Sequence, residues 1–136
     1  MLGEPESVPK GIAILAHPHP LHGGTMDNKV VQTLFTTLLA LGFITAKFNF
    51  RGVGKSEGAF DRGIGEIEDV MAVTQTVRDQ FNAHSADLPL LLAGFSFGGA
   101  IQLHAAGRLI PEFLILVAPS VVNLNAPAVP EATKYA

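Results

Sequence analysis

The chain has 136 residues and a formal net charge of −3 at pH 7; 48% of its residues are hydrophobic, 15% are charged and 14 are glycine. A chain of this length forms one domain with a real core, and its aliphatic composition favours a parallel sheet buried on both faces. The acidic balance argues against a nucleic-acid partner, and the absence of cysteine excludes a disulfide scaffold and a thiolate metal site.

No segment carries a targeting or membrane signal. Residues 1–10 contain acids and prolines without the charged-then-apolar pattern of a signal peptide. Residues 30–46 are nearly uncharged, but they divide into a helix, a glycine and a strand rather than forming one membrane span. We therefore expect a cytoplasmic protein with no membrane partner.

Strands and helices alternate along the chain. Continuous apolar runs predict four buried strands, at 11–16, 43–50, 90–95 and 113–117. Apolar residues at helical spacing predict helices at about 27–41 and 65–81, and a third that runs to about 109. Asp27 is the expected N-cap of the first helix, and Gly42 closes it. This alternation predicts an α/β fold with a parallel sheet and right-handed crossovers.

The third apolar run passes through glycines into a small-residue helix, and the junction contains the pattern Gly94-x-Ser96-x-Gly98. This spacing is typical of a nucleophile elbow, a tight strand-to-helix turn that exposes the serine hydroxyl and leaves no room for bulk two residues to either side. The helix N-terminus favours negative charge, so the Phe97 amide is the expected first donor to an oxyanion. The alternative is a structural turn in which the serine is incidental.

Residues 17–25, which we call the histidine loop, follow the first predicted strand and contain His17, His19 and His22. In a parallel sheet this loop lies at the same carboxyl edge as the serine, where ligands bind. The His19 amide is the expected second oxyanion donor, because the prolines on both sides of it have no N–H. Two alternatives stay open. In the first, the three histidines bind zinc, because their spacing is similar to the motif of dinuclear zinc hydrolases, although Leu21 occupies the position of the acidic ligand. In the second, the histidines only orient turns through hydrogen bonds with the backbone.

The sequence Gly54-Lys55-Ser56 is similar to the end of a phosphate-binding loop, but its spacing does not support nucleotide binding. That motif needs a glycine five residues before Gly54, where this chain has Asn49, and a helix should begin directly after it. We therefore expect no cofactor. Arg51, in the same stretch, is interpreted as a structural residue that fixes its loop.

The sequence does not complete a catalytic triad. A serine hydrolase of this type has its acid and then its histidine after the nucleophile, but only Glu112, Glu131 and His104 are available after Ser96. His104 lies eight residues along the predicted helix, about 12 Å of axial rise away, and cannot reach the serine hydroxyl. A histidine of the histidine loop can approach Ser96 across the strand ends, but no carboxylate is placed to orient it.

Three motifs occur in order along the chain: HPHPLHGGTMDNKVV at 17–31, FNFRGVGKSEG at 48–58 and AGFSFG at 93–98. Together they closely resemble the small, capless bacterial α/β-hydrolase family related to dienelactone hydrolases and serine aminopeptidases. The resemblance implies the α/β-hydrolase fold, Ser96 as nucleophile, an oxyanion hole formed by the Phe97 and His19 amides, and hydrolysis of a small-molecule ester.

Members of that family normally carry further strands before Gly11 and, after Val129, a strand that ends in the catalytic acid and a later segment with the catalytic histidine. We therefore expect residues 1–136 to be a single α/β-hydrolase domain that is incomplete at both ends. Its partial core of about four strands is expected in the order 44–50, 11–16, 90–95, 113–117. Both outer strands would then expose unpaired edges, which favours homo-oligomers.

The sequence is thus interpreted as a carboxylesterase-like serine hydrolase that forms an acyl-enzyme at Ser96. One alternative is a truncated, non-catalytic module that keeps the fold and the elbow. The other is a zinc-dependent hydrolase that uses His17, His19 and His22.

Overall fold

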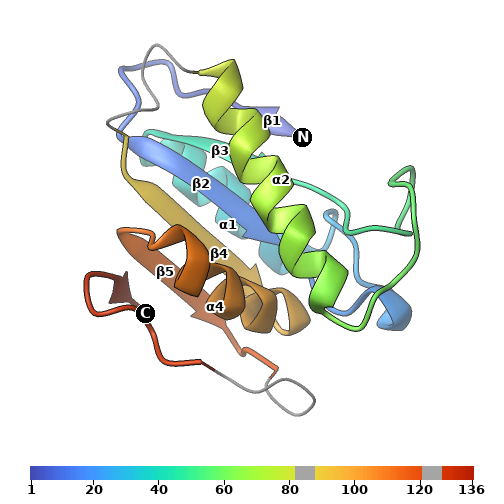
Figure 1. The fold of residues 1–136 in the computed structure, drawn as a ribbon. Helices are drawn as coiled ribbons and strands as arrows, with labels where there is room; N and C mark the ends of the chain where they lie inside the picture. Colours follow the sequence, from blue (N-terminus) through green and yellow to red (C-terminus); the bar gives the residue numbers. More distant parts are fainter. Residues whose placement is uncertain (82–87, 121–126) are drawn as a thin grey trace.

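Six strands form one sheet in the computed structural model, which describes residues 1–81, 88–120 and 127–136 (Figure 1). The strands are β1 (Leu2–Gly3), β2 (Gly11–Ala16), β3 (Phe43–Lys47), β4 (Leu90–Phe95), β5 (Phe113–Val117) and β6 (Lys134–Tyr135). Their order across the sheet is β1-β3-β2-β4-β5-β6. Every neighbouring pair is parallel except β1 and β3, so the predicted α/β fold is confirmed.

The four predicted strands and their order are confirmed, but the expectation of four strands with bare edges is wrong. β1 pairs with β3 and β6 pairs with β5, so each outer strand has a neighbour over two residues. A strand of two residues has no alternation or apolar run that a sequence pattern could detect. β3 is also shorter than predicted, because residues 48–50 leave the sheet and the Phe50 amide donates to the His17 side chain.

Helices cover both faces of the sheet. They are α1 (Lys29–Ala40), α2 (Ile64–Gln80) and α4 (Phe97–Leu109). In Figure 1, α2 and α4 lie in front of the sheet and α1 lies behind it. β2 is buried along its whole length, as a central parallel strand should be. No described helix has both the length and the apolarity to cross a membrane.

The first turns of α1 and α2 differ from one expectation and account for a buried acidic side chain. Asn28, not Asp27, is the N-cap of α1, because its side-chain oxygen accepts hydrogen bonds from the amides of Val30 and Val31 at 2.9 and 3.4 Å. At the start of α2, the fully buried Glu66 carboxylate accepts the amides of Asp61 and Gly63. Both arrangements satisfy N–H groups that the first helical turn leaves unpaired.

Apolar clusters on the two faces of the sheet hold the helices against the central strands. On the α1 face, Val31, Phe35 and Leu38 pack against β2 and β4. On the other face, α2 and α4 bury a larger cluster that includes Phe50, Phe97 and Ile101. Since β2, β3 and β4 are parallel neighbours, their carboxyl ends and the segments that follow them lie at one edge of the sheet.

Candidate active site

Ser96 lies between β4 and α4 with φ 55° and ψ −117°. A positive φ is strained for a residue with a side chain, and here neighbouring backbone groups hold it. The Ser96 amide donates to the Val117 carbonyl at 2.9 Å, and the Ser96 carbonyl accepts the Ser120 amide at 3.0 Å. The half-buried hydroxyl makes no hydrogen bond with any described residue.

Two glycines allow the turn to close. A Cβ placed on Gly94 would lie 2.3 Å from the Gly98 carbonyl oxygen, and a Cβ on Gly98 would lie 2.3 Å from the carbonyl oxygen of Ala16. The N-terminus of α4 is therefore in direct backbone contact with both β4 and the end of β2. This contact brings the histidine loop beside Ser96.

Phe97 is the first residue of α4, where a helix leaves its N–H groups without internal acceptors. Its amide has no hydrogen-bond acceptor among the described residues. Its buried ring contacts Phe50, Phe60 and the His19 imidazole, with ring centroids 5.7, 5.9 and 4.8 Å apart. The Phe97 amide is thus a free donor directly after the serine.

His17 is fully buried, and both of its ring nitrogens are occupied. Nε2 lies 3.0 Å from the Phe50 amide, which can only donate, so the proton is on Nδ1 and is donated to the Pro18 carbonyl at 2.7 Å. Burial lowers the pKa of His17, although the Pro18 hydrogen bond opposes this shift. A neutral ring with two engaged nitrogens is neither a base for Ser96 nor a metal ligand, so the zinc alternative loses its first ligand.

His19 and His22 stack on each other, with ring centroids 4.3 Å apart. Nδ1 of His19 accepts the Leu21 amide at 3.1 Å, so a neutral His19 ring carries its proton on Nε2. Burial lowers the pKa of His19, and the charge of His22 adds to this effect, whereas Glu66 opposes it. The His19 amide has no acceptor in the described part of the chain.

The acids and the histidine that follow Ser96 in the described ranges are not beside it. Glu112 accepts the Leu90 amide at 2.6 Å, at the amino end of β4, which is the opposite edge of the sheet from Ser96. Glu131 is exposed. His104 lies on α4 with its Nε2 buried and without a partner among the described residues. Within the same ranges no three acid, histidine or cysteine side chains are grouped to hold a metal ion.

Arg51 holds its loop, as the sequence suggested. Its guanidinium forms two hydrogen bonds with Asp69 Oδ1 of α2, at 3.1 and 2.8 Å, and its backbone amide donates to Asp69 Oδ2. The hydrogen bonds to Asp69 raise the pKa of Arg51. The same loop presents Phe60 to the His19 ring at 5.0 Å. Phe60 is not among the residues predicted for the site, although an aromatic residue in a polar, glycine-rich loop is a signal that the sequence offers.

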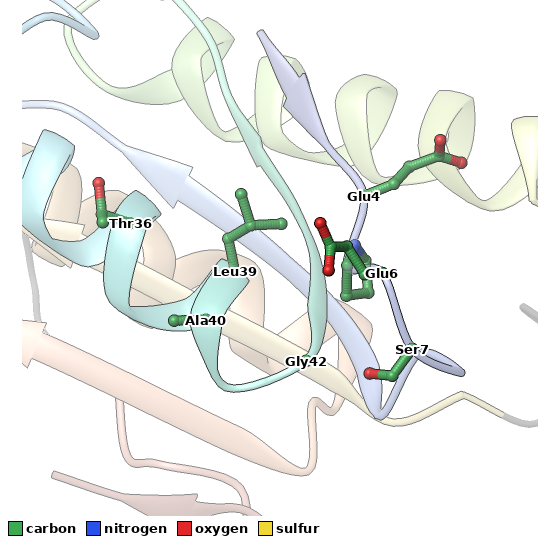
Figure 2. Close-up of a pocket in the computed structure, with 8 residues that line it drawn as sticks. Glu4, Glu6, Ser7, Thr36, Leu39, Ala40 and Gly42 are labelled. Atoms are coloured by element: carbon green, nitrogen blue, oxygen red, sulfur yellow. The ribbon is translucent and has the colours of Figure 1, made fainter.

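A separate groove of about 610 Å³ lies away from these residues (Figure 2). It lies between residues 4–7 and the C-terminal turn of α1, and it includes Gly42 directly before β3. It is therefore at the amino edge of the parallel strands, whereas Ser96 is at their carboxyl edge. None of the predicted site residues lines it.

Residues 15–135 match the family described as serine aminopeptidase, S33. An alpha-beta serine hydrolase homologue from Coxiella burnetii has a similar structure, with a TM-score of 0.88 and 43% identity over 99% of this chain and 64% of that one. A serine hydrolase without a lid from Xanthomonas campestris gives a TM-score of 0.87 and 39% identity over 98% of this chain and 61% of that one. An uncharacterized protein of Rickettsia prowazekii is 43% identical over 79% of this chain and 45% of its own length. The chain thus spans less than half the length of the curated relatives it matches and under two thirds of these solved structures.

Proposed function

The chain belongs to the serine aminopeptidase S33 family of α/β serine hydrolases, and on that premise we propose that it provides the nucleophile and the oxyanion hole of a carboxylesterase-like hydrolase of small esters. The observation that carries the proposal is the strained Ser96 between β4 and α4, followed directly by the free Phe97 amide. A reactive serine and a fixed N–H donor at a helix N-terminus are what acyl transfer requires.

In the proposed reaction the Ser96 oxygen attacks the ester carbonyl carbon while its proton passes to a general base. The amides of Phe97 and His19 donate to the oxygen on which negative charge develops. The tetrahedral intermediate collapses, the C–O bond to the alcohol breaks and the alcohol takes up a proton, which leaves an acyl group on Ser96. Water then attacks this acyl-enzyme by the same route and releases the carboxylic acid.

The general base is not His17, because both of its nitrogens are engaged. His19 is also unsuited, since its Nδ1 accepts the Leu21 amide and its Nε2 then holds the proton. The proposed proton acceptor is therefore neither of these two histidines, and the family resemblance implies a histidine that follows the catalytic acid in the family's chain order. The substrate class also comes from that resemblance.

A fluorophosphonate probe with peptide mass spectrometry tests the proposal. We expect labelling at Ser96, no labelling of the Ser96→Ala variant, and unchanged labelling of Ser120→Ala. The last variant is a matched control because Ser120 is hydrogen-bonded to Ser96 through its backbone amide, which alanine retains. If the folded protein is not labelled, the elbow has no working base, and the chain is the non-catalytic module that the sequence left open.

Two further parts of the proposal concern the whole molecule. We propose a cytoplasmic location, which fits a chain without cysteine and which cell fractionation would check. We also propose self-association through the sheet edges, because β1 and β6 each cover only two residues of the neighbouring strand. Light scattering tests this, and a strictly monomeric protein at all concentrations would contradict it.

A further inference from the structure

The peptide unit that joins Pro18 to His19 has two ends with different partners. Its carbonyl oxygen accepts the His17 Nδ1 proton at 2.7 Å, whereas its N–H, on His19, has no acceptor among the described residues. A trans peptide is planar, and its C=O and N–H point to opposite sides. Whatever fixes the direction of the Pro18 carbonyl therefore also fixes the direction of the His19 N–H.

The His17 ring is itself held at a second point. Its Nε2 accepts the Phe50 amide at 3.0 Å from the segment that follows β3, and its ring packs edge-on against the Phe50 ring at 4.7 Å. With no exposed surface, the imidazole cannot rotate without breaking both hydrogen bonds. His17 thus links the histidine loop to a segment 33 residues later in the chain.

The end of the histidine loop packs against the Pro18 carbonyl. The Gly24 amide donates to the His19 carbonyl at 3.0 Å, and a Cβ on Gly24 would lie 2.0 Å from the Pro18 carbonyl oxygen. The Pro18 carbonyl therefore accepts the His17 proton and has the backbone of Gly24 packed against it. Hydrogen bonding at a carbonyl also polarises its peptide, which makes the N–H at the other end a stronger donor.

We propose that His17 is a positioning residue of the oxyanion hole, which holds the Pro18–His19 peptide so that the His19 N–H faces the oxygen of an ester attacked by Ser96. This inference rests on the proposed function. It assigns the buried histidine a role in transition-state stabilisation rather than in proton transfer or metal binding.

Ester hydrolysis by the full-length enzyme tests the proposal with a matched pair of variants. His17→Phe keeps an aromatic side chain and removes both hydrogen bonds, whereas His104→Phe makes the same change on α4, where the imidazole forms no hydrogen bond with a described residue. Loss of one oxyanion donor costs about 10²–10³ in kcat. We expect His17→Phe to lower kcat by at least tenfold with KM nearly unchanged, because the oxyanion exists only in the transition state. We expect His104→Phe to behave as wild type.

A wild-type kcat for a folded His17→Phe would overturn the inference alone and leave the proposed function intact. A higher KM for His17→Phe with no loss of kcat would also overturn it, because that result indicates a purely structural role. If the wild-type enzyme neither hydrolyses esters nor reacts with the probe, the proposed function fails and the positioning role fails with it.

Nuclear magnetic resonance of the wild type tests the proposal even if His17→Phe does not fold. We expect the His17 ring to carry its proton on Nδ1, in wild type and in Ser96→Ala alike. We also expect the His19 amide proton to move downfield when a phosphonate is attached to Ser96, because the phosphonyl oxygen then occupies the oxyanion position. A proton on Nε2, or a His19 amide that does not respond to the adduct, would overturn the proposal.

Discussion

Replacing Gly98 with alanine should weaken both the fold and the reactivity of Ser96, although alanine is the better helix former. The added Cβ would lie 2.3 Å from the Ala16 carbonyl oxygen and 2.5 Å from that of His17. A carbon–oxygen contact needs about 3.3 Å, so α4 and the end of β2 must separate by about 1 Å. Overpacking of this kind costs about 1–3 kcal/mol, which exceeds the gain of up to about 1 kcal/mol from replacing glycine in a helix.

The same separation moves the His19 amide away from the Phe97 amide. A misplacement of 1 Å in a catalytic site costs about 10²-fold in rate. The assays are urea unfolding for stability and the rate of fluorophosphonate labelling for the site. We expect Gly98→Ala to lose about 1 kcal/mol or more in the free energy of unfolding and to label at least tenfold more slowly.

Gly107 provides the control within the same helix. A Cβ there meets nothing within 4 Å, so Gly107→Ala should gain about 0.5–1 kcal/mol of stability and label at the wild-type rate. The reasoning is refuted if Gly98→Ala is as stable and as reactive as Gly107→Ala. That result would mean that the close approach of α4 to β2 is not required.

Three further predictions concern the parts that support the site. Asn28→Ala should cost about 1 kcal/mol in urea unfolding because it removes the α1 N-cap, whereas Asp27→Ala should cost clearly less. Asp69→Asn should lower stability by about 1 kcal/mol and increase proteolysis of the Arg51 loop, and unchanged protection would contradict the bracing role. Because burial lowers the pKa of His17, the unfolded protein takes up a proton at this residue at a higher pH than the folded protein does. Stability should therefore be complete above pH 6.5 and decline as pH falls toward the lowered pKa, and a flat urea midpoint over this range would count against it.

The sequence predicted the elements whose physics is local. Four apolar runs are long enough to identify buried strands, and the glycine spacing around Ser96 records a backbone contact that no larger residue allows. The sequence places the α1 N-cap one residue too early, because Asp27 and Asn28 are both good capping residues. Only the backbone path decides which side-chain oxygen reaches the amides of Val30 and Val31.

The role of His17 could not be read from the sequence for a different reason. Its chemistry depends on which groups face its two nitrogens, and one of them belongs to Phe50, far along the chain. A buried histidine with two backbone partners and a histidine that binds zinc have the same sequence signature. The fold separates them, because the Phe50 amide can only donate and so determines which nitrogen carries the proton.

The relative position of the two proposed oxyanion donors depends on one strand pair. In the register of β2 and β4, Ala16 lies opposite Gly94, so the histidine loop and the elbow leave the sheet side by side. A slip of one residue would displace one donor by about 3.3 Å along the strand, whereas a catalytic arrangement tolerates about 0.5 Å. β2 and β4 are central and buried, and Gly98 packs against the end of β2, so a slip would expose apolar side chains and break that contact. The edge strands β1 and β6 can therefore vary without moving the donors, and the β2–β4 register cannot.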